Sequence, residues 1–296
     1  MQQRSPHHAK GLLVTAFGGM ILTFDIPLIR LASGDTWSVM LVRSGATFLA
    51  ALVIWAIWRS LSSKAPALAP GWTGVLVAAL YGLTSILFMM AIYRTSTANL
   101  AFILAFNSVF AALLSWVFLR EKPQTVTMIA MAIMLVGVLV IVGDGFAAGN
   151  FIGDLLALAS AFTAASAITL TRSSGKDMGL TALSGVLLSL VVAAYFVVDG
   201  GYRIDAPWWI LFNGAIVMPL AFYCLATGPR WLSAPEVAMF YLLETVLAPV
   251  WVWMIFAEAP TRNALIGGLI LISALVAHSI WQLWDTRRSA SVPAAQ

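Results

Sequence analysis

The chain has 296 residues, of which 61% are hydrophobic and only 9% are charged. Ordinary soluble proteins carry roughly 25% charged residues, so a soluble globule is excluded and the lipid bilayer is the expected solvent. The net charge of +4 does not indicate nucleic-acid binding, because the 16 Lys and Arg residues are scattered in ones and twos between apolar runs. Such scattered basic residues are typical of loops that orient membrane helices.

Pro, Gly and charged residues divide the chain into ten apolar segments of roughly spanning length. Because a bilayer requires every backbone polar group to be satisfied internally, all ten are predicted to be α-helices. The segments lie at 11–29, 37–58, 71–92, 96–119, 124–142, 151–171, 179–198, 207–227, 234–257 and 263–284.

Basic residues are distributed unequally between alternate ends of these segments. Eleven lie at the end that carries both termini, and four (Arg30, Arg94, Arg203 and Arg262) lie at the other. The remaining one, Arg43, lies within the second segment. Since cytoplasmic loops carry an excess of Lys and Arg, both termini are predicted to be cytoplasmic.

Residues 71–123 recur, with low identity but in nearly ungapped register, as residues 208–260. Each half contains five predicted helices, and an odd number of helices turns the second half upside down, which predicts inverted repeats. We expect a first repeat at 1–142, an outer connecting loop at 143–150, a second repeat at 151–284 and a cytoplasmic tail at 285–296. The matched pairs, offset by 137, include Trp72/Trp209, Ala78/Ala215, Ser96/Ser233, Ala101/Ala238, Val109/Val246, Trp116/Trp253, Glu121/Glu258 and Pro123/Pro260.

The stretch from Ser96 to Glu121 and its copy from Ser233 to Glu258 resemble the EamA domain of the drug/metabolite transporter superfamily. In that family a small polar helix start, a polar or Pro position within the helix and a terminal Glu recur once per half. The resemblance covers essentially the whole chain. It implies ten helices in two inverted repeats and a metabolite exporter, with amino acids, including aromatic ones, as the best-known substrates.

Glu244 lies in the middle of the ninth segment, and its repeat partner is Asn107 in the middle of the fourth. An ionisable side chain at the centre of a span costs about 2.5–3.5 kcal/mol on insertion scales, so it requires a partner, a wet cavity or a function. Glu244 is predicted to bind a substrate ammonium or a coupling proton, and Asn107 to contact a carboxylate or carbonyl. The alternative is a protonated Glu that hydrogen-bonds a neighbouring helix.

Gly82 and Pro219 also match between the repeats, near the middle of the third and eighth segments. Matched Gly or Pro interruptions in the two halves point to a transporter site, and we assign both residues to gating. Gly and Tyr are also common in membrane helices for packing and for interfacial anchoring, which is the alternative. The polar and aromatic residues nearby predict a substrate pocket formed by Tyr81, Thr84, Ser85, Asn213, Tyr223 and Tyr241 together with Asn107 and Glu244.

Asp25 and Arg43 lie toward the outer ends of the first two segments. Because these segments are antiparallel neighbours, the two charges are expected to form an ion pair. The alternative is an extracellular gate that opens when substrate or a proton competes for Asp25. Pro27 lacks a backbone donor and allows the end of the first helix to bend.

Enzyme motifs such as a phosphate-binding loop, His-Glu-x-x-His or Gly-x-Ser-x-Gly are absent from the sequence. We therefore expect an all-α polytopic carrier, not an enzyme, that exports amino acids, with apolar or aromatic ones favoured, or related metabolites by alternating access. We expect no cofactor, no metal and no nucleic-acid partner, and a monomer in the cell inner membrane. Proton coupling is left open, and the alternatives are a multidrug or other small-metabolite carrier and an intramembrane enzyme.

Overall fold

The structure, a computed structural model, describes residues 6–61, 67–120, 125–147, 149–174, 178, 180–227 and 234–290. Within these ranges the chain forms helices and no strand. The elements are α1 (Pro6–Leu22), α2 (Asp25–Leu31), α3 (Thr36–Leu61), α4 (Gly71–Ile92), α5 (Thr97–Leu104), α6 (Asn107–Leu119), α7 (Thr125–Ala147), α8 (Phe151–Ser174), α9 (Thr181–Gly200), α10 (Pro207–Phe212), the π-helical turn η1 (Asn213–Val217), α11 (Met218–Thr227), α12 (Ala234–Phe256) and α13 (Arg262–Ala290).

The predicted all-helical fold is confirmed for the described residues. Eight of their helical stretches are long and apolar enough to cross a membrane. The stretches predicted as the ninth and tenth spans contain shorter apolar runs, Leu243–Phe256 in α12 and Arg262–His278 in α13. Ten membrane crossings therefore stay a prediction.

Three predicted spans are interrupted. In the first, α1 ends at Leu22 and α2 begins at Asp25, because Pro27 has no N–H to donate to the carbonyl of Thr23. The fourth is divided between α5 and α6 just before Asn107. The eighth changes to a π-helical turn at Asn213, ahead of Pro219, and such turns are often found at functional sites.

The connection between the halves is shorter than predicted. Helix α7 continues to Ala147 and α8 begins at Phe151, so most of the expected loop at 143–150 is helical. Gly143 lies inside the last turns of α7, because a glycine in a helix lowers its stability without ending it.

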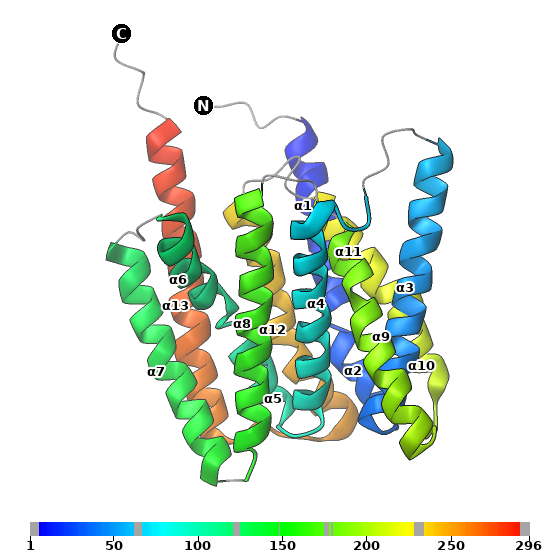
Figure 1. Ribbon diagram of the computed structural model, residues 1–296. Coiled ribbons are helices and arrows are strands. Elements are labelled where there is room, and N and C mark those ends of the chain that lie inside the picture. The colour runs from blue at the N-terminus through cyan, green and yellow to red at the C-terminus, as the bar shows by residue number, and fades with distance from the viewer. Residues whose placement is uncertain are drawn as a thin grey trace.

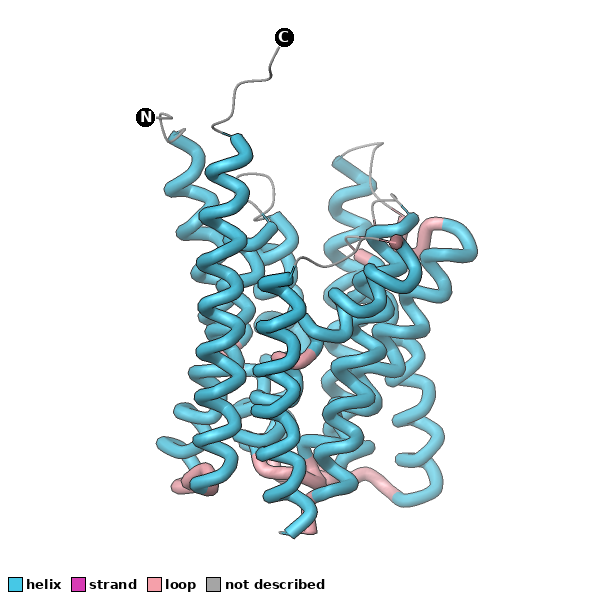
Figure 2. The backbone as a smooth tube through the Cα atoms, turned by 90° about the vertical axis from the view of Figure 1, so that its left-hand side faces the viewer, coloured by secondary structure: helices cyan, strands magenta, loops and turns pink. Residues whose placement is uncertain are grey.

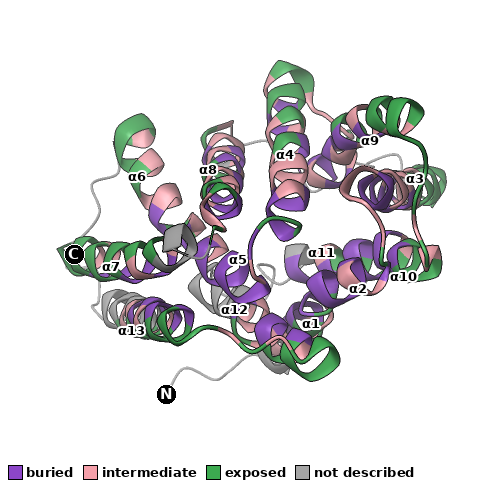
Figure 3. Cartoon of the chain, turned by 90° about the horizontal axis from the view of Figure 1, so that it is seen from below, coloured by how far each residue is buried: buried purple, intermediate pink, exposed green. Residues whose placement is uncertain are grey.

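Helices of the two halves pack in matched pairs (Figures 1 and 3). On one flank α7 packs against α13, and on the other α3 packs against α9. Between them α4 contacts α8 and α9, while its repeat counterpart, the α10–η1–α11 helix, contacts α3 and α1. The contacts of α4 and of its counterpart are therefore those that a twofold relationship between the halves would give them.

The start of α1 and the end of α13 lie at the same end of the bundle (Figures 1 and 2). We call the opposite end the distal end. There the loop after α2 joins the loop before α10 through backbone hydrogen bonds, in which Asp35 N donates to Arg203 O (3.1 Å) and Asp205 N donates to Ser33 O (3.1 Å). These bonds connect the first half of the chain to the second.

Candidate functional site

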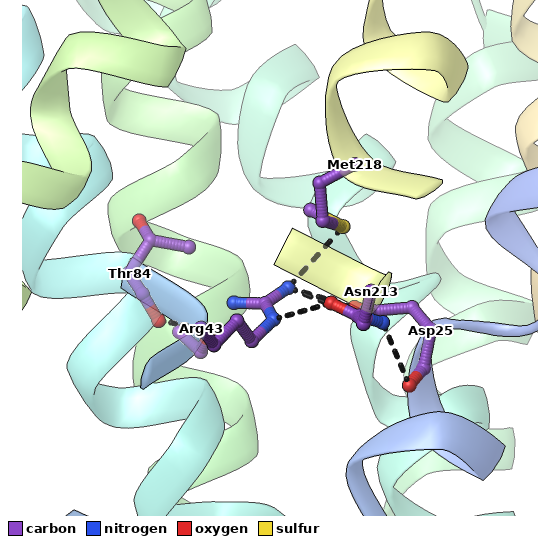
Figure 4. A network of polar contacts seen from close by, with 6 residues as sticks. Asp25, Arg43, Thr84, Asn213 and Met218 are labelled. Carbon is purple, nitrogen blue, oxygen red and sulfur yellow. Dashed lines mark hydrogen bonds and ion pairs between the residues drawn. The ribbon is translucent and has the colours of Figure 1, made fainter. Parts of the chain in front are cut away.

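Asp25, Arg43 and Asn213 form a buried polar network inside the bundle (Figure 4). Nη2 of Arg43 donates to both carboxylate oxygens of Asp25, at 3.1 and 2.9 Å. Its Nε donates to Oδ1 of Asn213 at 3.2 Å, and Nδ2 of Asn213 donates to Oδ1 of Asp25 at 2.8 Å. The expected ion pair between Asp25 and Arg43 is thus present, and Asn213 from the second half of the chain joins it.

Local structure brings these three side chains together. Asp25 is the first residue of α2, directly after the break in the first span. Asn213 begins η1. A Cβ added to Gly214 would lie 2.5 Å from the Arg43 carbonyl oxygen and 2.9 Å from Cβ of Ala46. Only glycine therefore allows η1 to approach α3 this closely.

The guanidinium of Arg43 has further contacts besides Asp25 and Asn213. Its Nη2 also contacts Sδ of Met218 at 3.4 Å, and its Cζ lies 5.8 Å from the centre of the Phe88 ring, within the range of a cation–π interaction. Nη1 makes no hydrogen bond to any residue that the structure describes. The guanidinium therefore retains donors for a ligand while its charge is balanced by Asp25.

Glu244 of α12 lies near enough to this network for the charges of Asp25 and Arg43 to act on it. Its side chain is partly buried. The structure thus joins three of the predicted residues, Asp25, Arg43 and Asn213, by direct contacts, with Glu244 close enough for their charges to act on it. They come from α2, α3, η1 and α12, two elements from each half of the chain.

Two other predicted residues carry buried polar atoms without a partner among the described residues. These atoms are Oγ of Ser85 and Oδ1 of Asn107. Most buried polar groups in proteins are hydrogen-bonded, so an unpaired one indicates a place for a ligand or water. Asn107 is the first residue of α6 and directly follows Phe106. The ring of Phe110 makes edge contacts with the rings of Phe106 and Phe162, with ring centres 5.1 and 5.4 Å apart.

The structure does not gather the predicted Tyr and Thr residues into one aromatic pocket. Tyr223 is 57% exposed, so its ring lies on the outer surface of the bundle. Tyr81 packs against the apolar cluster of Val77, Ala167 and Met178. Thr84 is hydrogen-bonded to Thr163 at 2.8 Å. The side chain of Tyr241 lies outside the described residues.

Gly82 does not interrupt a helix, because α4 runs unbroken from Gly71 to Ile92. A Cβ at Gly82 would lie 2.6 Å from the carbonyl oxygen of Gly185 and 2.7 Å from Cβ of Leu188. Its function is therefore close packing of α4 against α9, and the expected break at this position is wrong. Pro219 follows the π-helical turn by two residues, so of these two matched positions only Pro219 lies beside an irregular turn.

Sequence reasoning missed a second buried carboxylate, Asp154, in the first turn of α8. Thr95 Oγ1 donates to its Oδ1, and Nδ2 of Asn99 donates to the two oxygens at 3.3 and 3.4 Å. The signal was available, because Asp154 is an acidic residue within an apolar segment. Thr95 lies in the α4–α5 connection and Asn99 in the first turn of α5, so Asp154 fixes the start of α5 to α8.

A cavity of about 620 Å³ lies at the distal end, and none of the predicted substrate-binding residues lines it. Its polar lining includes Arg30, Tyr93, Arg94 and Glu258. Arg30 forms an ion pair with Glu258. Burial, reinforced by the charge of Asp35, raises the pKa of Tyr93 above its usual value, so its hydroxyl is neutral at neutral pH.

Comparison with known proteins gives the family. The EamA-like transporter family matches residues 9–143 and, a second time, residues 151–279. The chain belongs to the EamA-like transporter family. This EamA-like chain is therefore a member of the drug/metabolite transporter superfamily and a multi-pass membrane protein.

Individual relatives of this EamA-like chain are distant. The uncharacterized transporter sll1164 of Synechocystis is 25% identical over 226 residues, which are 70% of this chain and 65% of the relative, so the chain spans less than two thirds of that protein. Human solute carrier family 35 member F3 is 32% identical over 83 residues, which are 28% of this chain and 20% of that protein. A solved crystal structure with a TM-score of 0.63 and 15% identity covers 90% of this chain and 96% of its own, and this likeness shows the fold alone.

Proposed function

We propose that this EamA-like transporter exports amino acids, with apolar or aromatic side chains favoured, by alternating access. The observation that carries the proposal is the network of Asp25, Arg43 and Asn213 with Glu244 nearby, because it joins both halves of the chain inside the bundle. Ionisable groups within membrane spans are rare and mark substrate or ion pathways. Transporter sites generally lie between the two repeats.

An amino acid suits the polar groups of this site. Its ammonium group donates hydrogen bonds, which Glu244 and the unpaired Oδ1 of Asn107 accept. Its carboxylate accepts hydrogen bonds from Nη1 of Arg43 and from the hydroxyl of Ser85. The side chain of the substrate would lie against the aromatic group around Phe110, which favours apolar and aromatic side chains.

The same proposal includes the membrane arrangement. Ten spans form two inverted five-helix repeats in the cell inner membrane, with both termini in the cytoplasm. The protein is a monomer and is not an enzyme. The matched packing of α4 on α8 and of α11 on α1 supports the repeats. The excess of basic residues at the end that carries the termini supports the orientation.

Counterflow in proteoliposomes tests the function. The purified protein is reconstituted into vesicles preloaded with one amino acid at a time, and uptake of labelled phenylalanine or threonine is followed. Accelerated uptake with a restricted set of preloaded amino acids is the expected result. If no amino acid accelerates uptake while lipophilic drugs or other metabolites do, the proposed substrate is wrong and a multidrug or metabolite carrier replaces it.

A substitution in the network of Asp25, Arg43 and Asn213 tests whether counterflow depends on this site. Asn213→Ala removes one acceptor for Arg43 and one donor for Asp25 without placing a new charge in the membrane. Counterflow is expected to fall at least about tenfold, since charge-assisted hydrogen bonds are worth more than the 1.4 kcal/mol that a tenfold change requires. Asn263→Ala, at the exposed start of α13, is the matched control and should leave counterflow unchanged.

A further inference from the structure

The ion pair between Arg30 and Glu258 connects the two halves of the chain at the wall of the distal cavity. Arg30 belongs to α2, and Glu258 follows α12. Nη1 of Arg30 also donates to Oγ1 of Thr97 at 2.9 Å, and its Cζ lies 5.4 Å from the centre of the Phe256 ring. The guanidinium is thus held in one place by a carboxylate, a hydroxyl and an aromatic face.

This pair is accessible to solutes. The side chains of Arg30 and Glu258 are 30% and 32% exposed, so neither is sealed inside the protein. The adjoining cavity of about 620 Å³ is within the range that holds small molecules. A solute inside it would reach the guanidinium without any movement of the helices.

The charged lining of the cavity favours an anion. Arg30 and Arg94 contribute two positive charges, Glu258 contributes one negative charge, and Tyr93 is neutral. While Glu258 is paired with Arg30, the net positive charge of the cavity lining comes from Arg94. If Glu258 were displaced by a solute carboxylate, Arg30 would keep an equivalent partner in the planar geometry that guanidinium groups prefer.

We propose that Arg30 is a carboxylate-binding subsite of the distal cavity, and that Glu258 occupies it when no solute is present. The proposal rests on the proposed function, because the carboxylate is that of the transported amino acid. Exchange of the carboxylate of Glu258 for that of the solute releases the contact between α2 and the segment after α12. Binding of the solute thereby unlinks the two halves at this end of the molecule.

A cysteine placed in the cavity tests this subsite. Ser33 lines the cavity and is exposed, whereas Cys224 is buried, so Ser33→Cys in a Cys224→Ala background gives one accessible thiol. The rate of its modification by a methanethiosulfonate reagent is measured on the full-length protein in detergent. Phenylalanine and 3-phenylpropionate are expected to slow modification, and phenylalaninamide, which lacks the carboxylate, is expected not to.

Two substitutions then assign the effect to the ion pair. Glu258→Gln removes the competing carboxylate and should lower the half-protecting concentration of 3-phenylpropionate about tenfold, while Arg30→Gln should raise it at least about tenfold. Arg203→Gln, a distal arginine outside the cavity lining, is the matched control and should have no effect. Melting temperatures of all variants show whether each one is folded.

Each outcome bears on the subsite separately from the transport function. Equal protection by the acid and the amide, or protection that survives Arg30→Gln, would overturn the subsite even if counterflow succeeds. Protection by 3-phenylpropionate that depends on Arg30, together with no amino-acid counterflow, would retain the subsite and reject the amino acid as cargo. Unchanged protection in Glu258→Gln would reject the competition by Glu258.

Discussion

Arg43 illustrates how a buried charge depends on its partners. Its side chain and that of Asp25 are 6% and 5% exposed, so both charges have lost most of their contact with solvent. Removing one partner of a buried pair leaves an uncompensated charge, whereas removing both leaves none. The pair is therefore expected to respond very differently to single and double substitution.

For this reason Arg43→Gln should lower the free energy of unfolding by about 3–5 kcal/mol. The double variant Asp25→Asn/Arg43→Gln should recover a large part of that loss, because two amides can hydrogen-bond each other and Asn213. Denaturation of the purified proteins in detergent measures both changes. Equal losses in the single and double variants would show that the charges are not what stabilises this region.

Glu244 was predicted to bind either the substrate ammonium or a coupling proton, and the second of these functions can be tested separately. Glu244→Gln keeps the size and polarity of the side chain but cannot release a proton. Counterflow should persist in this variant, while the dependence of flux on pH should disappear. Asp199→Asn, an exposed carboxylate at the end of α9, is the control and should retain the pH dependence of the unmodified protein. Flux that varies with pH equally in both variants would exclude Glu244 as the proton carrier.

The sequence predicted the charged members of the site better than its lining. Asp25, Arg43 and Glu244 stand out because charge within an apolar run is costly wherever the helix points. Tyr223 was chosen from the residues around a repeat position, and nothing in that choice specifies which side of the helix it occupies. Phe110 and Phe162 were missed because the chain has 16 Phe residues, and the sequence does not specify which of them come into contact.

At the scale of elements, helix interruptions were only partly predictable. Pro27 explains the break before Asp25 through its missing N–H. The residues at this break pack against α12. Nε1 of Trp251 donates to Oγ1 of Thr23 at 3.0 Å, and the Trp251 ring stacks on the Phe24 ring with their centres 5.2 Å apart. The break before Asn107 has no Pro or Gly beside it, so no local signal in the sequence announced it.

Gly82 was predicted as a break and instead allows two helices to touch. Gly82→Ala places a Cβ 2.6 Å from the carbonyl oxygen of Gly185, and overpacking of this kind costs about 1–3 kcal/mol of stability. Gly143→Ala is the matched control within α7, where nothing lies within 4 Å of the added Cβ. That variant should gain stability by up to about 1 kcal/mol from helix propensity. Thermal unfolding in detergent compares them, and a stable Gly82→Ala protein would contradict the close contact.

At the scale of the whole molecule, the repeat in the sequence explains which helices meet. Residues 71–123 and 208–260 match at an offset of 137. In the bundle, α4 packs against α8 and α9 of the second half, and its counterpart, the α10–η1–α11 helix, packs against α1 and α3 of the first half. Periodicity and composition were sufficient to place the helices because the bilayer restricts the chain to one kind of element. The contact between Arg30 and Glu258 was not predictable in this way, because it joins residues 228 positions apart that lie at the ends of their helices.

The distribution of basic residues leads to a prediction for the whole chain. The sequence predicts eleven basic residues on the side of both termini and four on the other side, and this bias should hold the termini in the cytoplasm. A green fluorescent protein fused after Gln296 should therefore fluoresce, and alkaline phosphatase fused at the same point should be inactive. Fusion after Asn150, between the two halves, should reverse both readings, because five spans precede it. Identical readings at the two fusion points would require an even number of spans between them, and the inverted repeat would then be wrong.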